Sequence, residues 1–511
     1  MLAKVKTLGL TGIEGFDLVV EADLNNGLPK FDIVGLPDTA IKESKERIRS
    51  AIKNSLFKFP MLKLTVNLAP ADTKKEGPIY DLPIAIALMI CTGEIVCPNI
   101  KDYAFIGELG LDGTVRRAQG VLPLLIAARS LGHKKVFIPA ENAVEASFID
   151  GVEIYPAKTL ADVVYHLCGT IMQEPIAHRN FFDLQLPVTE QNDMCYVRGQ
   201  TAAKRAMEIA AAGGHNLMMI GTPGAGKTML ARCMPTILPA MTFEEALEVT
   251  KIHSISGILD PNEGIVWRRP FRSPHHTTTA ITLTGGGAKA KPGEISMAHN
   301  GVLFLDELPE YNRKTLETLR QPLEDGTITV ARVNNTIEYP AQFMLLASMN
   351  PCPCGNYGSK TKECRCSPSQ IHKYLEKMSG PLMDRIDLHI EVDGVSYEDL
   401  RVTDKLEERS ADIRERVNNA RRIQLARFEG TSTKCNAKMT SNQVNKYCKL
   451  DSESEELIKE AFDKLNLSAR AYNRILKVAR TIADLEGSEA IGMAHVAEAI
   501  GYRSLDKKYW M

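Results

Sequence analysis

The sequence predicts an α/β protein whose core is a parallel sheet and whose C-terminal part is helical. Between residues 194 and 399, short apolar runs typical of buried strands alternate with helix-like stretches. Residues 1–171 also alternate between strand-like and helix-like stretches, whereas residues 400–511 carry almost no strand signal. The 511 residues are enough for two or three domains, each able to bury its own core.

Composition limits the class of protein. The net charge of −1 means that any contact with nucleic acid must come from a local basic patch. No run of about 18 apolar residues occurs, so we expect no membrane span. Glu14 and Asp17 interrupt the N-terminal stretch where an export signal would be apolar, so we expect no export signal. The eleven cysteines, odd in number and mostly scattered, fit a reducing compartment, so we expect a cytoplasmic protein.

The N-terminal region contains two clear strand signals and two clear helix signals. Leu62–Pro70 and Lys134–Ala140 are predicted to be strands. Leu82–Gly93 and Val121–Gly132 are predicted to be helices, each ending at a glycine. A polar stretch with prolines follows and indicates a linker. The predicted organisation is a domain over residues 1–171, a linker over 172–193, an α/β core over 194–399 and a helical domain over 400–511.

The strongest motif joins a short strand to a helix. Leu217–Ile220 is apolar, Gly221–Thr228 matches G-x-x-x-x-G-K-T, and a helix starts directly afterwards, which is the context of a P-loop that binds ATP. Lys227 should reach the β- and γ-phosphates and Thr228 should ligate Mg²⁺. A glycine-rich turn with a chance lysine is the alternative. The residues predicted to bind the nucleotide are Gly221, Thr222, Pro223, Gly224, Ala225, Gly226, Lys227 and Thr228.

Acidic and polar residues follow two further strand-like runs. Asp306 and Glu307 end the run that starts at Gly301, where Mg²⁺-binding aspartates of P-loop enzymes lie. We expect Asp306 to hold Mg²⁺ and Glu307 to polarise the attacking water, with an acidic loop as the alternative. Asn350 ends another strand and is placed to orient that water. Arg385 lies between two aspartates and, taken alone, would be a surface ion pair.

Together these residues resemble the AAA+ ATPases, and within them the magnesium-chelatase-like branch. The closest resemblance is to the YifB/ComM family and covers essentially the whole chain. It is carried by "VRGQ", "GTPGAGKT", "FRSPHHTTT", "AHNGVLFLDELPE" and "SGPLMDRIDLHIEV". This resemblance implies an AAA+ core that binds ATP and Mg²⁺, followed by a helical lid.

The resemblance also implies roles for single residues. Gly199 and Gln200 would lie near the adenine, and Asn350 matches sensor 1. Arg385 matches the arginine finger that reaches the ATP of a neighbouring subunit, so hydrolysis would need a homo-oligomeric ring, a hexamer in this family. On the helical lid, Arg470 matches sensor 2.

The C-terminal helices contain a second arginine close to that position. "NRILKVARTIADL" places apolar residues on one helical face, as expected for a bundle. Arg474 is the second residue of this stretch and is the competing assignment for sensor 2.

The N-terminal region resembles the proteolytic domain of Lon, an α+β fold. The resemblance is carried by "KKEGPIYDLPIAIALMICTGEI" and "GELGLDGTVRRAQGVLPLLIAARSLGHKKVFIPAEN". Ile79 occupies the nucleophile's position and Leu122 that of the catalytic lysine. Because aliphatic side chains neither attack a carbonyl nor take a proton, we expect a scaffold or substrate-binding collar without peptidase activity.

A basic stretch is the candidate contact for DNA. Residues 265–293 contain five Lys/Arg and no Asp or Glu. Lys289 and Lys291 lie in a glycine-rich part of this stretch, which suits phosphate contacts without base reading. Arg332 lies at the tip of a hairpin predicted over Gly326–Pro340. The resemblance implies that both elements face a central pore; a solvated basic face or a subunit contact is the alternative.

By resemblance, the chain would be an ATP-driven hexameric DNA motor. Its activity would be that of a helicase or translocase promoting branch migration in recombination or natural transformation, on single-stranded or branched DNA. A protein-remodelling ATPase is the alternative from another class. A motor subunit for magnesium insertion into a tetrapyrrole is a third hypothesis, against which the Lon-like domain argues.

The stretch "NPCPCGNYGSKTKECRC" contains two C-x-C pairs separated by nine residues. Four thiolates can close a tetrahedral Zn²⁺ site that leaves no open position, so we predict structural zinc rather than a catalytic metal. Four unconnected thiols are the alternative, and the compartment disfavours disulfides. Zinc here would order the connection between Asn350 and Arg385. The predicted ligands are Cys352, Cys354, Cys364 and Cys366.

Overall fold

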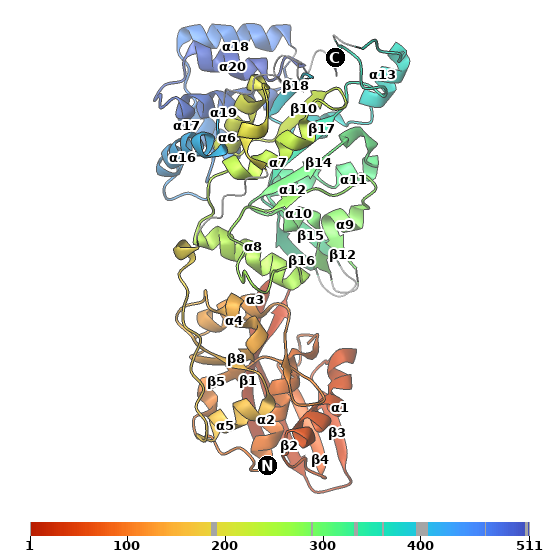
Figure 1. Ribbon diagram of the computed structural model, residues 1–511, viewed down its shortest axis with the longest axis vertical. Coiled ribbons are helices and arrows are strands. Elements are labelled where there is room, and N and C mark those ends of the chain that lie inside the picture. Colours follow the sequence, from red (N-terminus) through yellow and green to blue (C-terminus); the bar gives the residue numbers. More distant parts are fainter. Residues whose placement is uncertain are drawn as a thin grey trace. The chain divides into compact units, whose positions relative to one another are not determined.

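The computed structural model describes residues 2–184, 192–287, 290–331, 336–359, 362–394, 407–465, 467–505 and 509. The chain divides into two compact units (Figure 1). One unit comprises Met1–Gln185 and Phe243–Trp267, and the other comprises Leu186–Thr242 and Arg268–Met511. The segment Phe243–Trp267 therefore belongs to the first unit, although its residues lie within the predicted α/β core over 194–399.

The first unit is built on a mixed sheet. Its described strands form one seven-stranded sheet in the order β3-β4-β2-β1-β5-β8-β9. The pairs β1–β2 and β2–β4 are antiparallel, and the other neighbours are parallel. The strands are β1 (Leu2–Thr11), β2 (Glu14–Asn25), β3 (Lys30–Val34), β4 (Lys63–Ala69), β5 (Tyr103–Phe105), β8 (Lys135–Pro139) and β9 (Glu153–Ala157), beside the short pair β6 (Glu108–Leu109) and β7 (Val115–Arg116).

Helix α2 (Asp81–Cys91) is the central helix of this unit, because every residue in it except Ile90 is buried. Each fully buried isoleucine or leucine contributes about 1.5–3 kcal/mol, so this apolar helix anchors the domain. The predicted strands at Leu62–Pro70 and Lys134–Ala140 are confirmed, as are both predicted helices. The other helices are α1 (Thr39–Asn54), α3 (Val121–Ser130), α4 (Ala143–Ala146), α5 (Leu160–Leu167) and α8 (Phe243–Ser256).

The second unit contains the parallel sheet that the sequence predicts. Its order among the described residues is β11-β14-β17-β10-β18, and every neighbouring pair is parallel. All residues of β10, β14 and β17 are buried, as expected for strands covered on both faces. The strands are β10 (Leu217–Gly221), β11 (Phe271–Arg272), β14 (Val302–Leu305), β17 (Met344–Met349) and β18 (Leu388–Val392).

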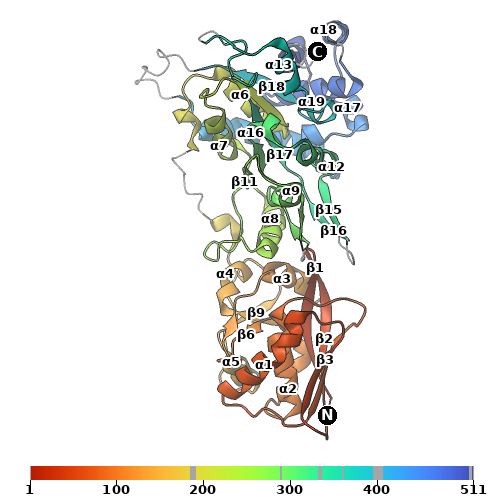
Figure 2. The ribbon, with the colours of Figure 1, turned by 90° about the vertical axis from the view of Figure 1, so that its right-hand side faces the viewer.

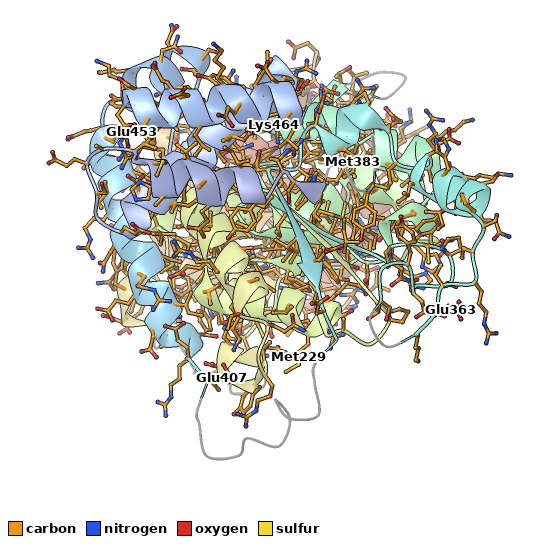
Figure 3. All side chains as sticks on the ribbon, turned by 90° about the horizontal axis from the view of Figure 1, so that it is seen from above. Met229, Glu363, Met383, Glu407, Glu453 and Lys464 are labelled. Atoms are coloured by element: carbon orange, nitrogen blue, oxygen red, sulfur yellow. The ribbon has the colours of Figure 1, made fainter. Side chains whose placement is uncertain are left out.

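The C-terminal helices share one hydrophobic core with this sheet. Helix α19 contributes Ile475, Val478, Ala479 and Ile482 from a single face, as predicted. In Figure 3, α18 runs from the labelled Glu453 to the labelled Lys464 and is one of these helices. The helices are α6 (Thr201–Gly213), α7 (Lys227–Ile237), α16 (Ser410–Arg427), α17 (Ser441–Tyr447), α18 (Ser452–Lys464), α19 (Ala469–Leu485) and α20 (Met493–Gly501).

Short elements complete the unit between β11 and β18. The predicted hairpin is confirmed by the antiparallel pair β15 (Thr327–Ala331) and β16 (Thr336–Pro340), seen beside α12 in Figure 2. The others are α9 (Ala280–Thr284), β12 (Gly285–Gly286), β13 (Lys291–Pro292), α10 (Glu294–Met297), α11 (Arg313–Glu317), α12 (Arg320–Asp325), α13 (Pro368–Leu375) and α14 (Gly380–Met383). In the part of the chain that is described, no helix combines the length and the apolar character needed to cross a membrane.

Candidate nucleotide site

The P-loop connects the end of β10 to the start of α7. Gly224 and Gly226 have φ angles of 82° and 89°, in the left-handed region that side chains rarely adopt. A Cβ at either position would meet nothing within 4 Å, so the backbone conformation is what requires glycine there. At Gly221 the reason is space, because a Cβ would lie 2.3 Å from the carbonyl oxygen of Val392 on β18.

The Lys227 side chain is buried at the start of α7. Its Nζ donates to the carbonyl oxygens of Gly221 and Thr222, at 2.6 and 3.1 Å, and to Oδ1 of Asn350 at 3.2 Å. Burial lowers the pKa of Lys227, and the charges of nearby acidic groups oppose that shift. The predicted phosphate-binding lysine and the predicted sensor 1 asparagine are therefore in direct contact.

Oxygen ligands suited to Mg²⁺ come together beside the loop. Thr228 Oγ1 donates to Asp306 Oδ2 at 2.9 Å, which joins the start of α7 to the tip of β14. The Ser348 hydroxyl donates to Asp306 Oδ1, and the Glu307 N–H donates to the same oxygen at 3.1 Å. A hydroxyl and a carboxylate are ligands that Mg²⁺ prefers, so this donor set fits the metal. Sequence reasoning missed Ser348, although it lies two residues before Asn350 and so points to the same face of the strand.

Glu307 follows Asp306 with a φ of 52°, and its side chain is 53% exposed. Its Oε2 lies 3.8 Å from Nδ1 of His276. The rings of His275 and His276 are 4.0 Å apart between centroids. His276 thus lies beside the predicted catalytic glutamate, and His275 lies beside His276.

Gln200 bridges the nucleotide loop to the end of β18. Its Nε2 donates to the carbonyl oxygen of Asp393 at 2.5 Å and to that of Ala225 at 3.4 Å. Gly199 precedes it, and its N–H donates to Glu407 Oε1 at 3.1 Å. The contact with Ala225 places Gln200 next to the P-loop, whereas the contact of Gly199 is to Glu407.

A second cluster of predicted residues lines a separate cavity of about 320 Å³ in the same unit. None of the described residues lining this cavity belongs to the P-loop. Acidic groups in the lining are Glu324 and Asp387. The basic residues of the lining are Arg385, Lys438, Arg470, Arg474 and Lys477.

Arg385 is only 6% exposed. Its guanidinium donates to the carbonyl oxygen of Pro381 and pairs with Glu324. Its Nε is buried and has no hydrogen-bond partner among the described residues. A buried donor without a partner costs about 1–3 kcal/mol, so this guanidinium is suited to donate to an anion.

Arg474 and Arg470 lie one turn apart on α19 and face the same cavity. Arg474 donates to Asp387 Oδ1 at 2.5 Å, and Asp387 Oδ2 lies 3.3 Å from His215 Nδ1. Burial would raise the pKa of Asp387, but the Arg474 charge and the His215 hydrogen bond outweigh it and hold that pKa well below its usual range. Arg474 is therefore committed to a partly buried ion pair, whereas Arg470 is exposed.

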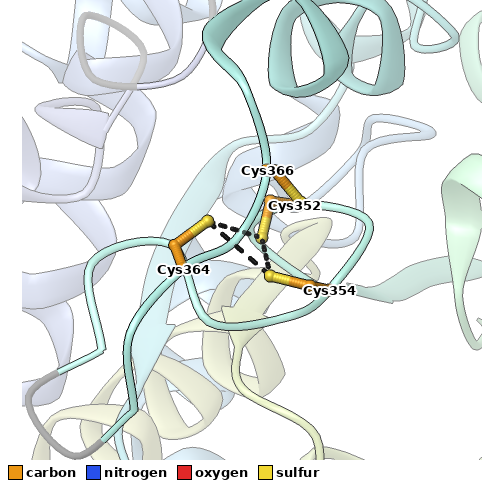
Figure 4. Close-up of side chains that lie close together, drawn as sticks. All are labelled: Cys352, Cys354, Cys364 and Cys366. Atoms are coloured by element: carbon orange, nitrogen blue, oxygen red, sulfur yellow. Dashed lines mark hydrogen bonds between the residues drawn. The ribbon is translucent and has the colours of Figure 1, made fainter.

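The four predicted zinc ligands converge (Figure 4). The Sγ of Cys352 lies 3.4 Å from that of Cys354 and 3.7 Å from that of Cys364, and the latter two are 3.6 Å apart. With Cys366, all four sulfur atoms lie within 4.8 Å of one another. Tetrahedral zinc with Zn–S bonds of about 2.3 Å would separate its sulfur ligands by about 3.8 Å, so the thiols fit this metal.

The basic stretch is less available than the sequence suggests. Arg272 forms a two-bond ion pair with Glu294, at 2.7 and 2.8 Å. Arg269 donates to backbone carbonyl oxygens, including that of Pro239 at 2.6 Å. Lys291 is exposed on β13. Two further candidates, Lys289 and Arg332, lie outside the described residues.

The positions of the Lon dyad are apolar and packed. Leu122 is fully buried in α3. Ile79 is partly buried, and its carbonyl oxygen accepts from the Gly107 N–H at 2.9 Å. Neither side chain can act as a nucleophile or a base.

Comparisons with known proteins agree with this arrangement. The family description "Magnesium chelatase, subunit ChlI" matches residues 193–400, "Subunit ChlI of Mg-chelatase" matches residues 20–142, and "Magnesium chelatase, subunit ChlI C-terminal" matches residues 407–503. Competence protein ComM of Haemophilus influenzae is 44% identical over 509 residues, which is 99% of this chain and 98% of that protein. A YifB protein of Salmonella typhimurium is 42% identical over 507 residues, again 99% and 98% of the two chains.

A Lon protease of Rhizobium meliloti is 29% identical over 175 residues, covering 32% of this chain and 21% of that protein. The parallel sheet, the P-loop and the acidic strand tip define the class as AAA+ P-loop proteins, which confirms the predicted fold class. Within that class, the chain belongs to the YifB/ComM family of magnesium-chelatase-like proteins.

Proposed function

We propose that this chain is the subunit of an ATP-hydrolysing ring motor, a hexamer, that acts on single-stranded or branched DNA. The main observation that supports a ring is that the predicted catalytic residues form two separate groups. The P-loop contacts Asn350 and Asp306, whereas Arg385 lines a cavity to which no described P-loop residue contributes. Separation of the arginine from the nucleotide loop of its own chain is expected in rings where each subunit completes its neighbour's site.

The residues at the P-loop suggest a division of labour in hydrolysis. Bound ATP supplies the phosphoryl group, and Mg²⁺ offsets the phosphate charge. Lys227 would hold the β- and γ-phosphates, while Thr228 and Asp306 provide the oxygen ligands for the metal. Glu307 is placed to take a proton from the attacking water, and Asn350 to orient that water.

The choice of DNA as the substrate is supported by the relative named as a competence protein and by the exposed Lys291. We propose a helicase or translocase that promotes branch migration in recombination or natural transformation. The test is the steady-state ATPase rate with no DNA, with single strands, with forks and with four-way junctions, beside migration of a labelled junction. Stimulation by junctions together with strand exchange is expected. A rate unaffected by every DNA form would refute the DNA assignment.

A protein-remodelling ATPase is the second candidate, favoured by the partial similarity to Lon. An unfolded protein such as casein replaces DNA in the same assay. If casein stimulates hydrolysis and DNA does not, the remodelling function replaces the DNA motor. Light scattering of the chain with ATP and Mg²⁺ tests the hexamer in either case.

We also propose that the four cysteines hold structural Zn²⁺. The sulfur separations support this metal, and the N–H of Tyr357 donates to Cys352 Sγ at 3.3 Å, a bond that stabilises a thiolate. Elemental analysis of the purified chain should find about one zinc per subunit, and Cys364→Ser should remove it.

A further inference from the structure

The four-cysteine loop lies against the P-loop, and we propose that metal bound by these cysteines supports the nucleotide-binding conformation. Loss of the metal would therefore weaken nucleotide binding. This inference rests on the proposed nucleotide and zinc sites, and it is independent of the DNA assignment.

Gly355 makes the contact between the two loops. A Cβ built on Gly355 would lie 2.5 Å from Cδ and 2.7 Å from Cγ of Pro223, a P-loop residue. The backbone of Gly355 thus packs directly on the proline ring, and its φ of 78° also favours glycine. Its N–H donates to the carbonyl oxygen of Cys352 at 2.9 Å, in the turn that brings Cys354 next to Cys352.

The end of strand β17 provides a second connection between the four-cysteine loop and the P-loop. Lys227 Nζ donates to Asn350 Oδ1, and only Pro351 separates Asn350 from Cys352. Cys352 is fully buried, whereas the other three cysteines are partly exposed. The first metal ligand is therefore close in the chain to the residue that holds the phosphate-binding lysine.

The described residues of this loop bury little surface. Of the described residues between 353 and 366, only Gly355 is buried, and none lies in a helix or strand. Tyr357 makes an edge contact with Tyr509 at 6.5 Å between ring centroids. A segment with so little buried surface does not offset its conformational entropy, so metal coordination supplies the missing stabilisation.

The consequence is a change in nucleotide affinity. Without metal, the packing on Pro223 and the position of Asn350 must be restored each time a nucleotide binds. Ordering one or two side chains and a short loop costs the free energy of about a tenfold change in Kd.

The experiment uses the full-length chain and measures metal content and the Kd of a fluorescent ATP analogue, in the absence of DNA. A zinc-selective chelator removes the metal, and dialysis restores Mg²⁺ before titration. Three variants accompany it: Cys364→Ser removes a ligand, Gly355→Ala disturbs the contact but keeps four thiols, and Cys168→Ser alters an exposed cysteine of the first unit. Circular dichroism and urea unfolding check that each variant is folded.

We expect the chelated chain and Cys364→Ser to lose zinc and to bind nucleotide about tenfold more weakly. Added Zn²⁺ should restore the chelated chain. Gly355→Ala should keep zinc but bind more weakly, and Cys168→Ser should match the wild type in both measurements.

The inference is overturned if folded, metal-free chain binds nucleotide as tightly as the zinc-loaded chain. It is also overturned if the purified chain holds no zinc and takes none up. If Cys364→Ser does not fold, chelation and rescue of the wild type decide the question. Failure of the zinc-loaded wild type to bind any nucleotide would refute the proposed function itself, which is a different result.

Discussion

Replacing Arg385 by alanine should nearly abolish ATP hydrolysis while leaving nucleotide binding unchanged. Arg385 is only 6% exposed, its Nε has no hydrogen-bond partner among the described residues, and none of the described residues lining its cavity belongs to the P-loop. An arginine of this kind lowers the barrier to phosphoryl transfer by about 4 kcal/mol or more, so the rate should fall at least ~10³-fold. Arg385→Lys keeps the charge but loses the planar fork, and it should recover only part of the rate.

Mixing two inactive variants gives the sharper test. Lys227→Ala has a defective P-loop and an intact Arg385, and Arg385→Ala has the reverse. In head-to-tail rings formed from equal amounts, about one interface in four joins an intact P-loop to an intact arginine. Phosphate release by the mixture should therefore reach about a quarter of the wild-type rate, although each variant alone is inactive.

Arg422→Ala is the matched control, because Arg422 is exposed on α16 and donates to Asn419 at 2.9 Å. It should hydrolyse ATP at the wild-type rate. Two results would refute the reasoning: an Arg385→Ala chain that remains active, or an inactive mixture in which light scattering and tagged subunits show mixed rings. The second result would mean that Arg385 does not serve the neighbouring site.

Three further predictions concern other parts of the chain. Glu307→Gln should lower kcat by about 10²–10⁴-fold with an unchanged nucleotide Kd, because an amide cannot take the water's proton; phosphate release and equilibrium binding measure this. Asp387→Asn should lower the free energy of unfolding in urea by about 1.5–3 kcal/mol, because it removes the charged partner of the partly buried Arg474. The pKa of Asp387 is lower in the folded chain than in the unfolded chain. The stability that its charge provides is therefore fully present above about pH 4 and is lost as pH falls through the folded-state pKa. The difference in unfolding free energy between variant and wild type should shrink on acidification. Casein incubated with the chain, ATP and Mg²⁺ should remain uncleaved on gels, because Ile79 and Leu122 provide neither nucleophile nor base; cleavage sensitive to a change at either position would contradict this.

The parts of the site that the sequence predicted are those with local signals. The spacing of Gly221, Gly226 and Lys227 is typical of a strand followed by a tight loop and the start of a helix. The P-loop could therefore be assigned without coordinates. Asp306 could be placed because the carboxyl ends of parallel strands meet at one edge of a sheet. Its hydrogen bond with Thr228 agrees with that expectation.

Contacts between segments that are distant in the sequence could not be predicted from any local motif. His276 and Glu307 follow different strands, β11 and β14, and nothing in their spacing predicts a separation of 3.8 Å. The same holds for Gly355, whose contact with Pro223 depends on how two loops fold over neighbouring strand tips. Such pairs are set by sheet order and loop geometry, which depend on the packing of the whole unit.

The sequence by itself determined the class of this protein, its nucleotide loop, its aliphatic residues at the Lon dyad positions and its four clustered cysteines. Those features depend on residue type and on short spacings, which backbone and coordination chemistry restrict directly. Only the tertiary structure decided that Arg470 and Arg474 share a cavity with Arg385, and that Asp387 holds Arg474 there. The physical reason is that α19 packs on the same core as β18, which brings charges from remote segments together around one cavity.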